Sequence, residues 1–231
     1  MASSAGELVR KAQAEVLENN AADYYRVYHR YERRYWREIP SWLQEEEKGV
    51  GRVLDIGCAY GTLLVLSKLL FECECYGIDL FPYISRELMN KHNLRCSLAT
   101  DIEVDPFPWE KSFDIIIMTE IIEHFRFRPE PTLVKIAKHL APGGRIYLST
   151  PNRNLWDARN NRAPMDSLNE LPFFYPGHPQ AWTALHDHTF QYDAKDIYAV
   201  AERSGLSVSR FSGDKNYEYN AILEPVEGWF A

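Results

Sequence analysis

Short runs of apolar residues recur along the chain, and stretches with helical spacing separate them. Such runs are typical of strands buried on both faces of a parallel sheet. We expect five of these strands, near 53–56, 74–78, 94–98, 113–118 and within 141–151. A helix over 193–204 and two strands at 207–211 and 219–223 follow, which predicts a hairpin at the sheet edge. The alternation predicts an α/β fold with a seven-stranded, mostly parallel sheet flanked by helices, and an antiparallel C-terminal hairpin.

Residues 7–47 precede the first strand and have the spacing of helices. Tyrosines recur in steps of four, three and four, which places them on one helical face: Tyr24, Tyr28, Tyr31 and Tyr35. Arginines fill much of the remaining surface, and Glu32 is the single acid between residues 24 and 37. Three interpretations stand: a helix packed on the domain, a lid over a bound substrate, or a basic aromatic surface for nucleic acid. We divide the chain into a helical lid or cap at 1–48 and a main domain at 49–231.

An irregular stretch, residues 152–192, lies between the fifth strand and the last helix and is rich in proline and aromatic residues. A loop of this length is usually functional, and its aromatic content favours folding over a ligand. We therefore expect a substrate cap. The expected walls of the substrate pocket are Phe125, Trp156, Phe173, Phe174 and Trp182.

The first predicted strand ends in a turn of small residues, and a helix is expected to begin near Tyr60. Gly57, Ala59 and Gly61 leave the backbone bare, so a ligand can approach the free N–H groups and the positive end of the helix. A nucleotide-like ligand suits this turn. The dinucleotide fingerprint fails, because its second and third glycines are replaced by Ala59 and Thr62, and no phosphate-binding loop follows.

The turn has the form acidic–x–Gly–x–small–x–Gly, beginning at Asp55, and in this it resembles the first motif of the class I S-adenosylmethionine-dependent methyltransferases, whose sheet is Rossmann-like. Ala59 replaces the usual middle glycine. Asp79, at the end of the second strand, is placed to accept the ribose hydroxyls of an adenosine. The resemblance implies that Asp101 accepts from the adenine amino group and that Ile102 packs on the ring. The residues expected to bind S-adenosylmethionine are Asp55, Gly57, Cys58, Ala59, Gly61, Asp79, Leu80, Asp101, Ile102 and Thr119.

A second group of polar residues follows the fourth strand. If a helix opens there, Glu120, Glu123 and His124 share one face beside the methyl donor. His124, assisted by Glu120, can act as a general base on an acceptor hydroxyl. The same three residues can instead ligate Mg²⁺, Mn²⁺ or Zn²⁺, with His186 or His188 as a further ligand. A purely structural role is the third interpretation.

The pattern Glu-x-x-Glu-His with a distant histidine is similar to two metal-using branches of the family. One is the ubiquinone-biosynthesis type of O-methyltransferase, which shares the Pro-Gly-Gly…Ser-Thr-x-Asn-Arg run at 142–153. The other is the small-RNA 3′-end 2′-O-methyltransferases, which carry a similar Ser-Thr-Pro-Asn and a late Asp-His-x-Phe, here 187–190. The resemblance covers residues 53 to about 190 and is strong only at the motifs.

Composition narrows the possible partners. A net charge of −7 argues against a protein that mainly grips a phosphate backbone, so we expect a small-molecule acceptor and no nucleic acid. The chain has no apolar run long enough to span a membrane, and its first residues lack the charged and apolar regions of a signal peptide. Its four cysteines fit a reduced protein, so we expect a cytoplasmic location. The sequence is also compatible with a homodimer.

Three functions follow in order of preference. The first is S-adenosylmethionine-dependent O-methylation of a small metabolite, with a metal ion as an optional aid. The second is 2′-O-methylation of an RNA 3′ terminus, favoured by the arginine-rich helix. The third is a non-catalytic cofactor-binding protein, which is less favoured because Asp55, Asp79 and Asp101 are retained together with the Glu-His segment at 123–124.

Overall fold

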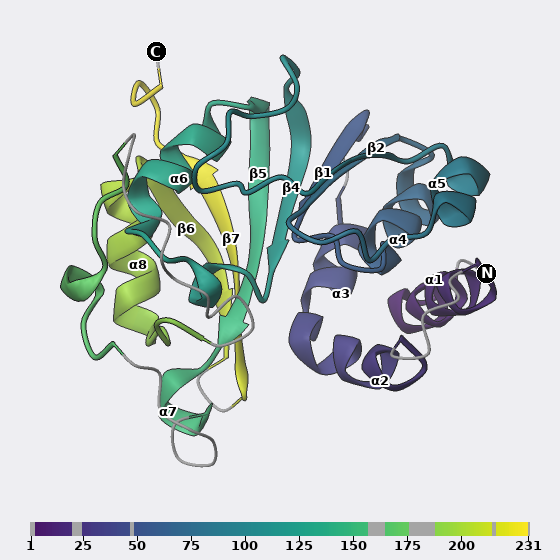
Figure 1. Cartoon of the computed structure of the whole chain (residues 1–231), viewed down its shortest axis with the longest axis horizontal. Helices are drawn as coiled ribbons and strands as arrows, with labels where there is room; N and C mark the ends of the chain where they lie inside the picture. The colour runs from purple at the N-terminus through teal and green to yellow at the C-terminus, as the bar shows by residue number, and fades with distance from the viewer. Residues whose placement is uncertain are drawn as a thin grey trace.

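The computed structural model describes residues 3–19, 25–46, 49–156, 165–175, 188–213 and 216–230. Its centre is a seven-stranded sheet with the strand order β3-β2-β1-β4-β5-β7-β6 (Figure 1). The strands are β1 Arg52–Ile56, β2 Glu74–Asp79, β3 Arg95–Leu98, β4 Phe113–Thr119, β5 Leu140–Pro151, β6 Leu206–Ser212 and β7 Glu218–Pro225. The predicted α/β class and the seven-stranded sheet are confirmed.

The first five strands are parallel, and the strand order reverses beside β1. Val53 of β1 pairs with Cys75 of β2 on one side and with Ile115 of β4 on the other. In open α/β sheets, ligands bind at the carboxyl ends of the strands where such a reversal leaves a crevice. β7 runs antiparallel to both β5 and β6, which confirms the predicted hairpin.

Helices cover both faces of the sheet (Figure 1). They are α1 Ala5–Asn19, α2 Tyr25–Trp36, α3 Ile39–Gln44, α4 Thr62–Phe71, α5 Arg86–His92, α6 Pro129–Ala137, α7 Arg153–Trp156 and α8 Ala194–Arg203, with the short 3₁₀ helices η1 Ile122–His124 and η2 Leu168–Glu170. One hydrophobic cluster joins α6 and α8 to the sheet, and a second joins α1, α3 and α4 to the opposite face. Among the described residues, no helix combines the length and the apolar character needed to cross a membrane.

The N-terminal helices pack directly on the main domain. Val9, Ala12 and Val16 of α1 are buried in the same hydrophobic cluster as the apolar face of α4. On α2 the predicted tyrosine stripe is divided, because Tyr28 is partly buried whereas Tyr31 is 47% exposed. Tyr24 lies outside the described residues. The helical prediction for this region is confirmed, and its role as a lid stays a prediction.

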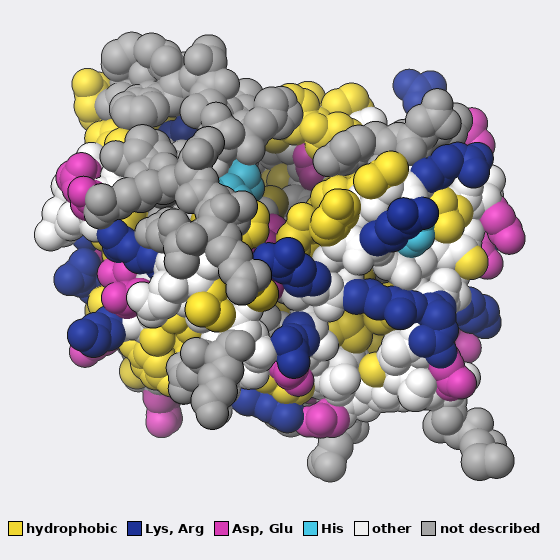
Figure 2. Space-filling view, turned by 90° about the horizontal axis from the view of Figure 1, so that it is seen from below, with side chains coloured by type: hydrophobic (Ala, Val, Ile, Leu, Met, Phe, Trp, Pro, Cys, Tyr) yellow, Lys and Arg dark blue, Asp and Glu magenta, His cyan; other side chains and the backbone are white. Residues whose placement is uncertain are grey.

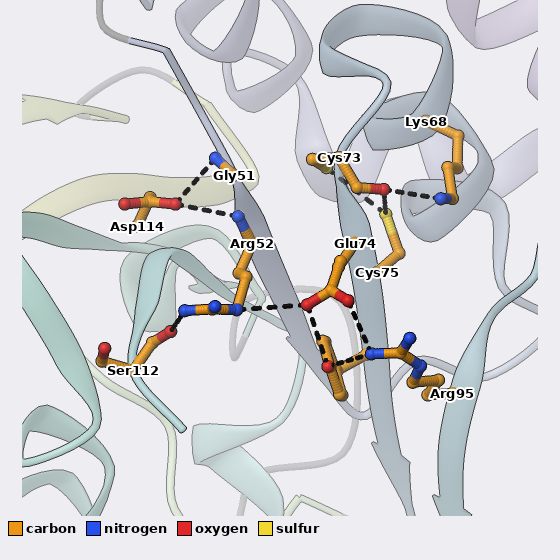
Figure 3. Close-up of polar contacts among 10 residues, drawn as sticks. Gly51, Arg52, Lys68, Cys73, Glu74, Cys75, Arg95, Ser112 and Asp114 are labelled. Carbon is orange, nitrogen blue, oxygen red and sulfur yellow. Dashed lines mark hydrogen bonds and ion pairs between the residues drawn. The ribbon is translucent and has the colours of Figure 1, made fainter.

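Polar contacts fix the amino ends of the parallel strands (Figure 3). Glu74 of β2 accepts from Arg52 of β1 at 3.1 Å and from Arg95 of β3 at 2.8 Å. Asp114 of β4 accepts from the backbone N–H groups of Gly51 and Arg52, both at 2.8 Å. Four neighbouring strands therefore start in a fixed register, and their carboxyl ends are aligned at the other edge of the sheet.

Two cysteines lie near these contacts (Figure 3). The sulfur atoms of Cys73 and Cys75 are 3.6 Å apart, and both residues are buried. Lys68 donates to the backbone carbonyl of Cys73 at 2.6 Å. Within the described part of the chain, these thiols belong to no group of three candidate metal ligands. They are core residues.

Candidate active site

The turn after β1 adopts a conformation that only small residues accept readily. Gly57, Ala59 and Gly61 all have positive φ angles, of 76°, 42° and 87°. A Cβ atom on Gly57 would lie 2.0 Å from Cδ1 of Ile121, so a side chain there would force Ile121 to move. The Gly57 N–H donates to the Ile78 carbonyl of β2 at 2.8 Å. Helix α4 starts at Thr62, two residues later than predicted, because Gly61 caps it in the left-handed conformation.

Asp79 holds this turn from the end of β2. One carboxylate oxygen accepts from the Ala59 N–H at 2.8 Å, and the other accepts from the Phe81 N–H at 2.8 Å. Burial raises the pKa of this carboxyl above its usual range. Each oxygen keeps a second lone pair, so the carboxylate can accept from a ligand as well.

A main cavity of about 360 Å³ opens at the carboxyl ends of the parallel strands, and its size suits a small-molecule ligand. Figure 2 shows this face hollowed near its centre, with hydrophobic side chains around the hollow and acidic side chains visible inside it. Nine of the predicted cofactor and catalytic residues line the main cavity: Gly57, Ala59, Asp79, Leu80, Asp101, Ile102, Thr119, Glu120 and His124.

Three predicted cofactor residues lie elsewhere. Asp55 and Cys58 line a second, smaller cavity of about 20 Å³ behind the turn, which we call the annex. Gly61 lines neither cavity and packs against Ile84, whose Cδ1 would be 2.5 Å from an added Cβ. Gly61 therefore serves the shape of the turn.

Asp101 has a protein partner that the sequence did not reveal. Its carboxylate accepts from the guanidinium of Arg126, and one of its oxygens accepts from the Glu103 N–H at 3.0 Å. Arg126 also lies 3.2 Å from Glu103, and both residues are 8% exposed and line the main cavity. Glu103 in turn accepts from the backbone N–H groups of Arg126 and Phe127. The wall expected to meet an adenine thus contains a buried ion-pair network.

The helix expected to open at Glu120 is shorter than predicted. Glu120 precedes η1 with a φ of 55°, so it does not share a helical face with Glu123 and His124. Its carboxylate accepts from the Ser149 hydroxyl at 3.0 Å. Burial, then the neighbouring charges of Glu123 and Glu218, raise the pKa of Glu120. Glu120 lines both cavities and so lies where they meet.

Glu123, His124 and His188 form a compact cluster beside the main cavity. Their candidate ligand atoms all lie within 4.8 Å of one another. The backbone N–H groups of Thr189 and Phe190 donate to the Glu123 carbonyl at 2.8 and 3.2 Å, which brings the His188 segment to η1. His186 lies outside the described residues.

The side chains of this cluster have the chemistry of metal ligands. Glu123 is fully buried, and one oxygen accepts from the Thr150 hydroxyl at 2.9 Å. Its other oxygen has no hydrogen-bond partner among the described residues and lies 3.8 Å from Nε2 of His124. Burial and the nearby His124 lower the pKa of His188 to about 4, so its imidazole is neutral, the form that ligates metals. One carboxylate and two imidazoles fit Mn²⁺ or Zn²⁺ well.

Two further buried acids were missed. Glu32 of α2 is 2% exposed and lines the annex. Glu218 of β7 is also 2% exposed and lies 3.4 Å from the Arg34 guanidinium. Burial raises the pKa of Glu218 to about 7. Neither belongs to a motif, and both come from segments distant in sequence: Glu32 lines the annex, and the charge of Glu218 acts on Glu120.

The aromatic residues expected to form the walls of the acceptor pocket do not come together in the structure. Phe125 lines the main cavity, and the Trp156 ring stacks on His188 with 4.9 Å between centroids. Phe174 packs on Phe127 outside the cavity, and Phe173 is 59% exposed. Trp182 lies outside the described residues. The substrate cap at 152–192 stays a prediction.

Comparison with known proteins agrees with this geometry. Residues 28–209 match the family described as "Methyltransferase domain". The chain belongs to this family, and its fold is that of the class I S-adenosylmethionine-dependent methyltransferases. An S-adenosylmethionine-dependent methyltransferase from Clostridium acetobutylicum superposes with a TM-score of 0.61 at 14% identity, over 89% of this chain and 100% of that one. The O-methyltransferase NcsB1 of neocarzinostatin biosynthesis, solved with S-adenosylmethionine, has a TM-score of 0.57 at 12% identity, over 86% and 55% of the two chains.

Two curated relatives are O-methyltransferases. The ubiquinone biosynthesis O-methyltransferase of Xanthomonas oryzae pv. oryzae is 36% identical over 109 residues, or 44% of each chain. The chloroplastic tocopherol O-methyltransferase of Arabidopsis thaliana is 31% identical over 138 residues, or 54% of this chain and 36% of the plant protein. The matches thus span less than half the length of these relatives.

Proposed function

We propose that this protein transfers a methyl group from S-adenosylmethionine to a hydroxyl oxygen of a small-molecule acceptor, with a divalent cation held by Glu123, His124 and His188. The observation that carries the proposal is the convergence of these three side chains beside a cavity whose wall contains the cofactor turn. The names of the curated relatives support an oxygen acceptor. A cation bound by this cluster would lower the pKa of the acceptor hydroxyl.

The chain's own residues position the cofactor. The bare backbone at Gly57 and Ala59 allows close approach, and the Asp79 carboxylate faces the same cavity with lone pairs left for ribose hydroxyls. Asp101 and Ile102 line the wall assigned to the adenine. Tyr28 of α2 and Phe125 complete apolar walls that exclude water, which supports a lid role for α2.

The fit of a cation rests on two features of the cluster. The partnerless Glu123 oxygen is costly to bury without a cation or a proton, and burial raises the pKa of Glu123 to about 8. The neutral His188 has the lone pair that a ligand needs. Glu120, at the junction of the two cavities, stays a candidate for a further ligand or for assisting His124 as a base.

Titration of the protein with Mn²⁺, followed calorimetrically, tests the cation site. We expect saturable binding that His188→Ala and Glu123→Gln abolish and that His139→Ala leaves unchanged, because His139 stacks on Phe107 away from the cluster. Methylation of a panel of hydroxylated aromatic compounds should be lost with a chelator and restored by the metal. Chelator-insensitive activity that survives His188→Ala would overturn the cation site and leave His124 as the candidate for a metal-free base.

A second candidate acceptor is the 3′ terminus of an RNA. The observation in its favour is a row of exposed arginines, at positions 26, 30 and 33 of α2 and at position 37 just after the helix ends. The spacing of the three on α2 places them on one helical face. Figure 2 shows dark-blue Lys and Arg side chains gathered on the side of the N-terminal helices. If this candidate is correct, binding of a short RNA falls steeply as salt rises. Absence of binding at low salt would rule it out.

A further inference from the structure

The annex joins the main cavity at the cofactor turn. Residues that line both cavities include Tyr28, Gly57, Ala59, Thr119 and Glu120. The annex itself measures about 20 Å³, which is enough for one group the size of a water molecule. A ligand lying across the turn can therefore extend one small terminal group into the annex.

Asp55 supplies an unsatisfied acceptor to the annex. Its side chain is 2% exposed, and its Oδ1 atom has no hydrogen-bond partner among the described residues. A buried polar atom without a partner is destabilising, so native structures rarely retain one without a role. Asp55 therefore points to a ligand that donates hydrogen bonds.

Glu32 supplies a second carboxylate from α2. Its outward neighbours on the helix are arginines, yet its own side chain points inward and is buried. It accepts from Gln13, from Tyr25 and, through Oε1, from Thr62 at 2.7 Å. Glu32 and Thr62 both line the annex, and Glu32 Oε1 has a further lone pair that can accept from a ligand.

The acidic residues around the annex determine which kind of ligand group it can bind. In the described parts of the chain, neither Glu32 nor Asp55 forms an ion pair with a lysine or arginine, and Glu120 and Asp79 add further acids nearby. These acids repel a carboxylate, and the volume is too small for a guanidinium. An ammonium group is compact, cationic and carries three donors.

We propose that Glu32 of α2 and Asp55 of β1 together bind the ammonium group of the methionine part of S-adenosylmethionine, so that α2 forms part of the cofactor site. This inference rests on the proposed function for the identity of the cofactor. It assigns Glu32 a binding role, because the cofactor supplies the cation that the buried carboxylates lack. It also makes the docking of α2 and the occupancy of the cofactor site mutually stabilising.

Release of a proton from Asp55 on cofactor binding provides a second test of the proposal. Burial, then the charges of Asp79 and Glu32, raise the pKa of Asp55 to about 8, so this carboxyl is mostly protonated at pH 7 before the cofactor binds. The other titratable groups facing this region are Cys58 on the turn, Glu120 after β4 and His29 near Glu32. Arrival of an ammonium favours the charged carboxylate, and a proton is released.

Calorimetric binding of S-adenosylhomocysteine tests the proposal, with its deaminated analogue as the paired ligand. For the wild type, we expect the analogue to bind about 10- to 100-fold more weakly, because a charge-assisted contact is lost. Glu32→Gln should weaken S-adenosylhomocysteine by a similar factor and leave the analogue unchanged. Glu15→Gln, which alters a partly buried acid on α1 paired with Lys91, is the control and should change neither affinity.

Calorimetric titrations measure the number of protons released on binding when they are repeated at pH 7 in two buffers of different ionisation enthalpy. The wild type should release protons on binding S-adenosylhomocysteine, and Asp55→Asn should release fewer. If the wild type and Glu32→Gln both preferred S-adenosylhomocysteine over its deaminated analogue by the same factor, the inference would be overturned. The proposed function would still stand. Failure of the wild type to bind S-adenosylhomocysteine or S-adenosylmethionine at all would overturn the proposed function itself.

Discussion

The Asp79 carboxylate accepts a 2.8 Å hydrogen bond from the backbone N–H of Ala59, and this bond ties the end of β2 to the turn after β1. The same carboxylate accepts from the Phe81 N–H. Asp79 therefore shapes the backbone on which the cofactor is expected to lie, in addition to facing the cavity itself.

Replacing this carboxylate should affect both stability and binding. Asp79→Ala leaves two backbone donors without their acceptor, and we expect a loss of about 1–3 kcal/mol in the free energy of unfolding. Affinity for S-adenosylhomocysteine should fall by at least about tenfold. Urea unfolding and calorimetry measure the two effects.

A matched control separates the two consequences. Asp193 caps α8, away from the cavity, by accepting from the Asp196 N–H at 2.9 Å. Asp193→Ala should lower stability by about 1 kcal/mol, as a lost helix cap does, and leave cofactor affinity unchanged. If Asp79→Ala behaved like this control, the role of Asp79 would be structural only.

Gly57 should not tolerate a methyl group. An added Cβ would lie 2.0 Å from Ile121, and the φ of 76° is strained for any other residue. We expect Gly57→Ala to destabilise the protein by about 1–3 kcal/mol and to weaken cofactor binding. Gly49→Ala is the control, since a Cβ there has no neighbour within 4 Å among the described residues. Equal melting temperatures for the two variants would contradict the packing described for the turn.

Asp55 should give the unliganded protein a pH-dependent stability. The folded state holds a proton on Asp55 up to about pH 8, whereas the unfolded chain releases it near the ordinary pKa of 3.8. The contribution from this carboxyl is fully present below pH 3.8 and is lost as pH rises through about 8. Asp55→Asn should therefore become relatively more stable than the wild type as pH increases from 6 to 9. Parallel stability curves from urea unfolding would show that Asp55 titrates normally.

The buried ion pairs of Arg126 should be costly to break. Arg126→Met removes the guanidinium between Asp101 and Glu103, and we expect a loss of about 3–5 kcal/mol, as when one partner of a buried pair is removed. Arg10, which is exposed on α1, provides the control, and Arg10→Met should change stability by less than about 0.5 kcal/mol. A loss for Arg126→Met no larger than that of Arg10→Met would mean that water replaces the guanidinium.

The sequence alone predicted the sheet and the cofactor turn because both depend on local patterns. Apolar runs mark the buried parallel strands, and the spacing from Asp55 to Gly61 reflects backbone positions where side chains do not fit. Asp79 was predictable because the end of a second strand lies beside the end of the first in any parallel sheet.

The remaining site residues depend on contacts between distant segments. Glu32 lies among arginines, so its sequence context suggested an exposed position, and it is buried because α2 packs against Gln13 of α1 and Thr62 of α4. Glu218 comes near Glu120 because β7 pairs antiparallel with β5. Arg126 follows His124 closely, but its pairing with Asp101 and Glu103 requires the fold to bring 101–103 beside 126.

The polar contacts of Arg52, Glu74, Arg95 and Asp114 lie at the amino ends of the parallel strands (Figure 3). The residues that line the two cavities lie toward the opposite, carboxyl ends. The contacts that fix the strand register and the residues that line the cavities therefore lie at different ends of the same strands. We expect that substitutions at the amino ends change thermal stability, and that a surface linker can be attached there, without altering the residues that line the cavities. For protein engineering, this edge of the sheet is the natural place to modify the enzyme.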